Sequence, residues 1–96
     1  MDEMIRRCEG LKLKNKEETL QKALMFYRLL TINFPERKIN RNAMLSSCIY
    51  ISAGLLGERG ITQANLARAF NISESTLNKR YKEAVTLLFP DAGKKT

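Results

Sequence analysis

The fold is decided by the stretch ITQANLARAFNISESTLNKRYKEAVTLLF, residues 61–89. Thr62 can cap a helix that runs to about Phe70, because its hydroxyl can accept a hydrogen bond from a first-turn backbone amide. Asn71 tolerates left-handed backbone angles and can end that helix. The first part of the stretch therefore predicts a short helix that closes in a tight turn.

A second helix follows this turn. Ser73 can cap it, Glu74 begins it, and Pro90 stops it because proline disfavours helical geometry in the residue before it. Its apolar side chains fall on one face, at Leu77, Tyr81, Ala84, Val85 and Leu88. That face is expected to pack against the rest of the chain.

The spacing of the two helices matches the unit that lays its second helix in the major groove of DNA. Where the two helices touch, four positions after Gln63, a small residue is needed, and Ala67 supplies it. Ile72 then follows as the apolar plug of the turn. The spacing favours a helix-turn-helix at residues 62–89, and the alternative is a helix pair that only completes a bundle.

If the apolar face points inward, the polar side chains of the second helix form an exposed reading surface. Asn can pair with adenine, Lys can reach guanine or phosphate, and Ser can donate or accept. The predicted base-reading residues are Ser73, Glu74, Ser75, Asn78, Lys79 and Lys82. The predicted phosphate contacts, which hold register without carrying sequence information, are Thr62, Gln63, Arg68 and Arg80.

Three helices are expected upstream. The first covers about residues 2–9 and ends at Gly10. The second opens at Asn15, with Glu18 placed for reciprocal capping, and runs to about residue 34. The third, residues 42–56, carries apolar or small residues on nearly every side and belongs in the middle of a bundle. The chain thus predicts an all-α, five-helix domain at residues 1–90, followed by a flexible tail at 91–96.

The composition limits the function classes. The chain has 96 residues, enough for one domain, and a net charge of +7 that favours a polyanionic partner, although charge also keeps small proteins in solution. It has no histidine, and its two cysteines, Cys8 and Cys48, are not spaced for zinc, so we expect reduced, semi-buried thiols and no metal or cofactor. With no signal peptide or membrane span in sight, we expect a cytoplasmic, nucleoid-associated protein, or a nuclear one in a eukaryote.

Residues 57–85, GERGITQANLARAFNISESTLNKRYKEAV, strongly resemble the second cyclin-like repeat of archaeal transcription factor B and eukaryotic transcription factor IIB. The resemblance lies in the Thr-Gln helix start and in the run Arg80, Tyr81, Lys82 and Glu83. Upstream, SSCIYISAGLLGE is similar to the central helix of each cyclin repeat, and MDEMIRRCEGLKL to its first short helix.

The resemblance implies a cyclin-like fold around the residue 42–56 helix. It also implies a general initiation factor that reads promoter DNA beside the TATA box and assembles with TATA-binding protein and RNA polymerase. The chain departs from the family in having one repeat and no zinc-ligand pattern, so we expect an excised domain or a reduced relative.

Two other function classes compete with DNA binding. A protein-interaction adaptor would use the helical bundle to grip a partner, with the positive charge incidental. An enzyme is disfavoured, because no cluster of acid, base and nucleophile occurs and no histidine can activate Ser46 or Ser47. No small-molecule substrate is therefore expected.

Overall fold

The computed structural model describes residues 6, 8, 13–33, 41–58 and 60–90. These residues form four α-helices and no strand: α2 (Lys16–Asn33), α3 (Arg41–Leu55), α4 (Gln63–Ala69) and α5 (Glu74–Leu88). The predicted all-helical class is confirmed, with helix bounds within one or two residues of those expected. The helix predicted at about residues 2–9 falls largely outside the described residues, as does the tail 91–96, so five helices are not shown.

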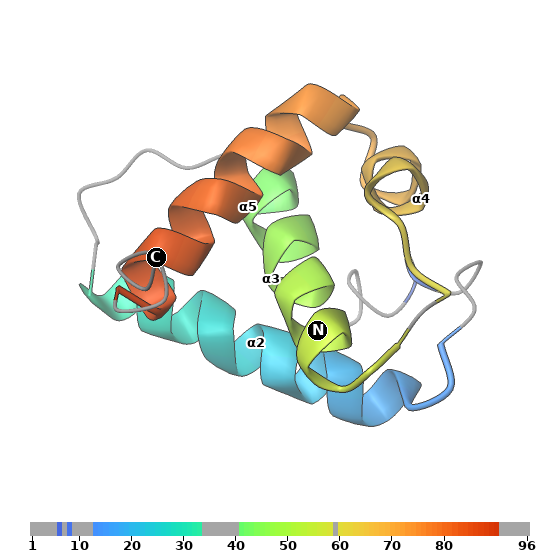
Figure 1. The fold of residues 1–96 in the computed structure, drawn as a ribbon, viewed down its shortest axis with the longest axis horizontal. Coiled ribbons are helices and arrows are strands. Elements are labelled where there is room, and N and C mark those ends of the chain that lie inside the picture. Colours follow the sequence, from blue (N-terminus) through green and yellow to red (C-terminus); the bar gives the residue numbers. More distant parts are fainter. Residues whose placement is uncertain (1–5, 7, 9–12, 34–40, 59, 91–96) are drawn as a thin grey trace, which may run out of the picture.

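The helix α3 lies at the centre of the bundle, between α2 and α5, with α4 to one side (Figure 1). Every residue of α3 from Ala43 to Ile49 is buried. A helix that is apolar or small on all sides is stable only when neighbours cover it, which explains its central position. The prediction of a central helix at residues 42–56 is confirmed.

Buried hydroxyls let the helices around α3 approach closely. Ser46 and Ser47 donate to the carbonyl of Ala43 at 3.0 and 2.7 Å, and Ser52 donates to the carbonyl of Thr19 on α2 at 2.7 Å. These bonds satisfy polar groups that would otherwise be costly to bury. The serines therefore serve packing. The Oγ1 atom of Thr19 is itself buried without a hydrogen-bond partner among the described residues.

Two aromatic pairs attach α5 to its neighbours. Tyr50 of α3 and Tyr81 of α5 meet edge to face, with ring centroids 4.9 Å apart. Phe26 of α2 and Phe89, the residue that ends α5, meet in the same way at 5.8 Å. Such pairs add about 0.5–1.5 kcal/mol beyond the area they bury. They fix the rotation of α5 on the bundle.

The end of α3 is joined to the start of α2 through Glu58. Gly57, with φ of 74°, turns the chain so that the amide of Glu58 donates to the carbonyl of Ala53 at 2.8 Å. The Glu58 carboxylate then accepts from the backbone amides of Lys14, at 2.6 Å, and Asn15, at 3.4 Å. The Asn15 amide, predicted to bond Glu18, thus bonds a residue far along the chain instead.

This link predicts the effect of substitutions at Glu58. Glu58→Ala leaves two amides without their acceptor and should lower the free energy of unfolding by about 1–3 kcal/mol. Glu58→Gln keeps an oxygen acceptor and should cost less than half as much. Urea unfolding followed by circular dichroism measures both, and an Ala variant as stable as the original chain would show that the carboxylate does not hold these amides.

The thiols are more deeply buried than the sequence indicated. Cys8 and Cys48 are both free and fully buried. Burial raises the pKa of Cys48 from 9.0 to about 12. Burial also raises the pKa of Cys8 to about 11, and the nearby charge of Lys16 opposes part of that rise. Because only the thiolate is nucleophilic, both thiols react slowly with electrophiles near neutral pH.

Two measurements test these pKa values. Iodoacetamide at pH 8 should label the native chain far more slowly than the urea-unfolded chain. Because folding raises the thiol pKa above 9.0, its stabilising contribution is complete below pH 9 and is lost as pH rises toward 11. The free energy of unfolding should therefore fall over that window, and less so in Cys48→Ala. Rapid native labelling at pH 8 would contradict the assignment.

Candidate nucleic-acid interface

Both helices of the C-terminal pair begin at a capping hydroxyl, as predicted. The Thr62 side chain accepts from the amide of Asn65 at 3.1 Å, and the Ser73 side chain accepts from the amide of Thr76 at 3.1 Å. Both capping residues have extended backbone angles. Each cap binds a first-turn amide that the helix itself cannot satisfy. The starts of α4 and α5 are therefore encoded locally.

The turn between α4 and α5 is a Schellman motif built on a left-handed asparagine. Asn71 has φ of 55°, and its amide donates to the carbonyl of Arg68 at 3.2 Å. The amide of Ile72 donates to the carbonyl of Ala67 at 2.9 Å. This pair of bonds closes the end of α4 and reverses the chain within a few residues. The predicted role of Asn71 is confirmed.

Long-range contacts hold the turn on the bundle. The side-chain amide of Asn42, at the start of α3, donates to the carbonyl of Phe70 at 3.3 Å, and the Phe70 side chain is fully buried. The Ser47 hydroxyl, beside its bond to Ala43, lies 3.4 Å from the carbonyl of Leu77, which is also fully buried. The helix pair is therefore set at a fixed angle to α3.

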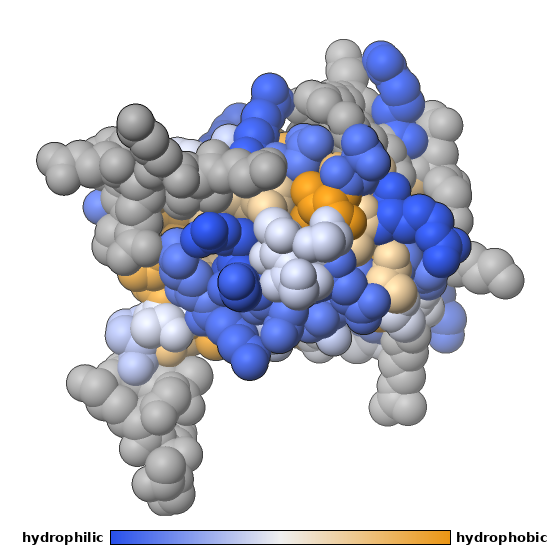
Figure 2. Space-filling model, turned by 90° about the horizontal axis from the view of Figure 1, so that it is seen from above, coloured by the Kyte–Doolittle hydropathy of each residue, from blue (hydrophilic) through white to orange (hydrophobic). Residues whose placement is uncertain are grey.

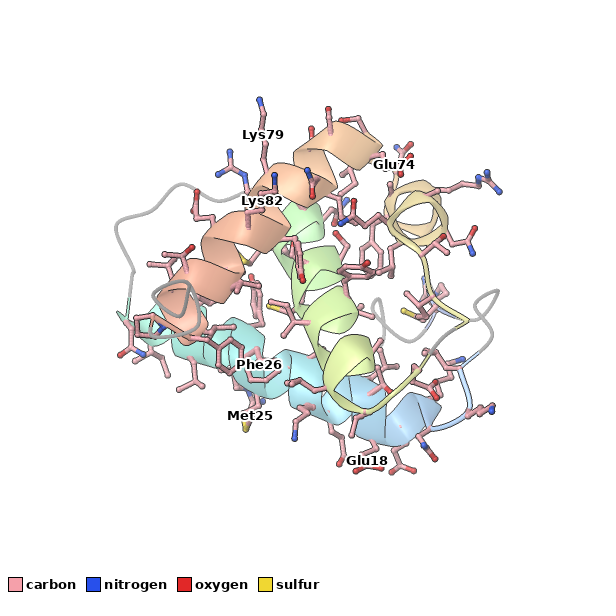
Figure 3. The ribbon with its side chains drawn as sticks, in the orientation of Figure 1. Glu18, Met25, Phe26, Glu74, Lys79 and Lys82 are labelled. Atoms are coloured by element: carbon pink, nitrogen blue, oxygen red, sulfur yellow. The ribbon has the colours of Figure 1, made fainter. Side chains whose placement is uncertain are left out.

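With Leu77 and Ala84 buried, the opposite side of α5 faces solvent. Lys79 projects from α5 away from α2, with Lys82 beside it (Figure 3). Ser75, Lys79 and Lys82 are all exposed. Figure 2 shows this side of the molecule as mostly hydrophilic, with a small hydrophobic patch. We call Ser75, Lys79 and Lys82 the outer face of α5.

The predicted base-reading residues divide by what they already bind. Ser73 is exposed, but its hydroxyl caps α5 and also lies 2.7 Å from the hydroxyl of Thr76, so it has little capacity left for a base. Glu74 is exposed in the first turn of α5, at the end beside α4 (Figure 3). A carboxylate there is favoured by the helix dipole.

Asn78 and Gln63, assigned to different roles from the sequence, lie together. The Gln63 side-chain amide donates to the Asn78 Oδ1 atom at 3.3 Å, so this bond joins α4 to α5. Both residues are half-buried. The bond leaves the Asn78 amide group as a donor and the Gln63 Oε1 atom as an acceptor. The two side chains therefore act as one polar unit at the junction of the helices.

Arg68 and Arg80, the two arginines predicted to contact phosphate, differ in exposure and in pairing. Arg68, in the last turn of α4, is exposed. Arg80 pairs with Glu83 on the same helix, with Nη1 and Oε2 3.0 Å apart, and its side chain is 37% exposed. Arg80 thus lies at the edge of the outer face of α5 with a carboxylate beside it. Thr62, also a predicted phosphate contact, is exposed at the cap of α4.

Two residues that hold this part of the fold, Asn42 and Glu58, could not be recognised from the sequence. Asn42 and Glu58 bond to backbone groups 28 and at least 43 residues away, respectively. No local pattern encodes such pairs. The one signal in the sequence is that the apolar α3 segment has a polar residue near each end, Asn42 at its start and Glu58 after its end.

The geometry defines a helix-turn-helix: two capped helices, a tight left-handed turn, and a second helix with one face buried and the other charged. A family model described as a Cro/C1-type HTH DNA-binding domain matches residues 53–88. The match covers α4, the turn and α5. DNA binding by this part of the chain is thereby supported. No curated protein and no solved structure matches the chain.

This match corrects the resemblance to transcription factor B. Residues 57–85, which carried that resemblance, fall inside the segment that matches the Cro/C1-type domain. A capped helix, a turn and a helix with an apolar face are requirements of any helix-turn-helix, so these features do not distinguish one class from another. The cyclin-like fold and the assembly with TATA-binding protein and RNA polymerase rested on that resemblance and fall with it.

The described residues hold neither a metal-binding cluster nor a membrane-spanning helix. No cluster of three or more His, Cys, Asp or Glu residues within them could hold a metal ion. Across the same ranges, no helix has the length and apolar character needed to cross a membrane.

The left-handed turn predicts a clear order of stability among variants at residue 71. Asn71→Val should lower the free energy of unfolding by about 1–2 kcal/mol, because a left-handed backbone brings its side chain too close to the following carbonyl. Asn71→Gly should be tolerated, since glycine adopts this conformation freely. Urea titrations give both values. A Val variant as stable as the Gly variant would show that the turn is not left-handed in solution.

Proposed function

We propose that this chain is a transcriptional regulator that binds duplex DNA by laying the N-terminal half of α5 in the major groove. The observation that carries the proposal is the outer face of α5, where Ser75, Lys79 and Lys82 are exposed next to a helix-turn-helix held rigidly on the bundle. A helix of this kind fits the major groove, where base edges can be read. The net charge of +7 favours the approach of DNA.

The proposal gives the exposed residues different roles. Lys79 and Lys82 would contact phosphate or guanine, and Ser75 a base edge or a phosphate. Glu74, at the start of α5, would accept from the amino group of cytosine. The Gln63–Asn78 unit would meet a base or a phosphate with its free amide donor and carbonyl.

The flanking residues would set the register on the duplex. Thr62 and Arg68 of the α4 segment are exposed and would contact the phosphate backbone. Arg80 would do so only in competition with Glu83. Ser73 keeps its role as the helix cap, and its mutation would act through the position of α5.

A protein-interaction adaptor is the second candidate, favoured by an exposed apolar strip on α2. Met25, Leu29 and Ile32 are 48%, 42% and 73% exposed and recur at helical spacing. Met25 points away from α5 (Figure 3), so a protein held there would leave the outer face of α5 open. The strip adds a contact surface but gives no reason for the lysines on the opposite side.

Charge removal from the outer face of α5 tests the DNA proposal. In Lys79→Gln/Lys82→Gln, affinity for a fluorescent mixed-sequence duplex should fall more than tenfold at low salt. The slope of log affinity against log salt should become shallower by about 1.8, taking 0.9 per lost phosphate contact. Fluorescence anisotropy over a salt series measures both quantities.

The matched control is Lys14→Gln/Arg28→Gln. It removes the same charge from exposed positions in and just before α2. It should retain most of the affinity and the original salt slope. Equal effects of the two double variants would mean that only net charge matters and that α5 is not the DNA-binding element.

Sequence reading is tested separately, by selecting bound duplexes from a random pool at two salt concentrations. An enriched motif that changes in Glu74→Ala or Asn78→Ala would support base reading by α5. The adaptor would be favoured if no motif is enriched and if Lys79→Gln/Lys82→Gln leaves the affinity for DNA unchanged.

A further inference from the structure

A cavity of about 350 Å³ lies between the C-terminal half of α3, the segment that leads into α4, and the C-terminal half of α5. Tyr50 and Gly54 line it from α3, and Tyr81 and Val85 from α5. Its size falls in the range of about 300–1,000 Å³ that small-molecule sites occupy. It is separate from the outer face of α5, because Tyr81 lies on the packed side of that helix against Tyr50.

The walls of the cavity combine apolar side chains with two tyrosines, Tyr50 and Tyr81, and one carboxylate. Ile51, Ile61, Val85 and Phe89 contribute hydrocarbon surface, and Glu58 contributes the negative charge. The Glu58 residue is only 9% exposed. A carboxylate in such surroundings is costly unless a positive charge or several donors accompany it.

The Glu58 carboxylate is only half satisfied by the protein. Its Oε2 atom accepts from the amides of Lys14 and Asn15, and no cation pairs with it among the described residues. Its Oε1 atom has no hydrogen-bond partner within that part of the chain. One acceptor and an unneutralised negative charge are therefore available at the cavity wall.

The aromatic rings add a second preference for a cation. Tyr50 and Tyr81 both line the cavity and meet edge to face at 79°. Ring faces attract ammonium groups by about 0.5–2 kcal/mol, depending on how well the site excludes water. Phe89 extends the aromatic surface. The ligand chemistry that fits is a protonated amine on an apolar or aromatic body.

We propose that this cavity binds a small organic cation, with its ammonium group on Glu58 and its apolar body against α3 and α5. The bound amine would donate to the free Oε1 atom and neutralise the carboxylate. Because Tyr81 and Val85 belong to the helix assigned to DNA, the ligand would also bias the position of α5. That last consequence rests on the proposed function, whereas binding of the cation does not.

The test compares three indoles that differ in their charge. Tryptamine is a cation at pH 7, tryptophol replaces its amine by a neutral hydroxyl, and indole-3-acetate is an anion. Each is titrated into the full chain, labelled with ¹⁵N and free of DNA, and followed by amide chemical shifts and calorimetry. Tryptamine should bind about tenfold more tightly than tryptophol, and indole-3-acetate should not bind. The largest amide shifts caused by tryptamine should fall on Tyr50, Gly54, Glu58 and Tyr81.

Two variants separate the site from non-specific binding. Within the part of the chain that the structure describes, a side chain at Gly54 meets no atom within 4 Å of its Cβ position. Gly54→Leu should therefore fill the cavity without disturbing the fold and should abolish tryptamine binding. Ala64→Leu, at an exposed helical position outside the cavity, is the matched control and should bind normally. Glu58→Gln keeps an amide acceptor and should reduce the tenfold preference for the amine to near unity.

Several results would overturn the proposal: equal binding of the three indoles, unchanged tryptamine binding in Gly54→Leu, or chemical shifts confined to the α2 strip. Circular dichroism shows whether each variant is folded. If Glu58→Gln does not fold, Gly54→Leu still tests the site. Because no DNA is present, failure here leaves the DNA-binding proposal standing. Failure of the Lys79 and Lys82 experiment likewise leaves the cation site standing.

Discussion

The packing of Leu77 against the small-residue side of α3 is the contact on which the rest of the molecule depends. Leu77 is fully buried, and its carbonyl lies within hydrogen-bond distance of the Ser47 hydroxyl. Once this residue faces inward, the helical repeat fixes which side chains of α5 meet solvent. The outer face of α5 is therefore a consequence of core packing. A larger side chain at Ser47 would push α5 outward and change that face.

The same rotation of α5 gives its two sides different environments. On one side, Lys79 and Lys82 stand in solvent, where charge is inexpensive and long-range attraction to a polyanion operates. On the other, Tyr81 and Val85 border a cavity that the largely buried Glu58 also lines. A single helix thus separates the surface that we propose for DNA from the cavity that we propose for an amine. Movement of α5 would couple the two.

Local chemistry explains why the helix-turn-helix was predictable. Thr62, Asn71 and Ser73 act on backbone groups within a few residues of themselves, so their roles follow from sequence position alone. The prediction was wrong in assigning this pattern to transcription factor B, because caps and apolar spacing are common to all helix-turn-helix units. The sequence alone also suggests separate roles for Gln63 and Asn78, but their side chains are hydrogen-bonded to each other across the two helices.

The sequence by itself determined the four described helices, the caps of α4 and α5, the left-handed turn and the polar side of α5, since each depends on interactions within one or two helical turns. Only the tertiary structure decided that Asn42 binds the carbonyl of Phe70, that Glu58 holds the start of α2, and that a cavity opens beside Tyr81. These features join residues far apart in the chain. Which residues become their partners depends on how the helices pack, and no short stretch of sequence determines helix packing.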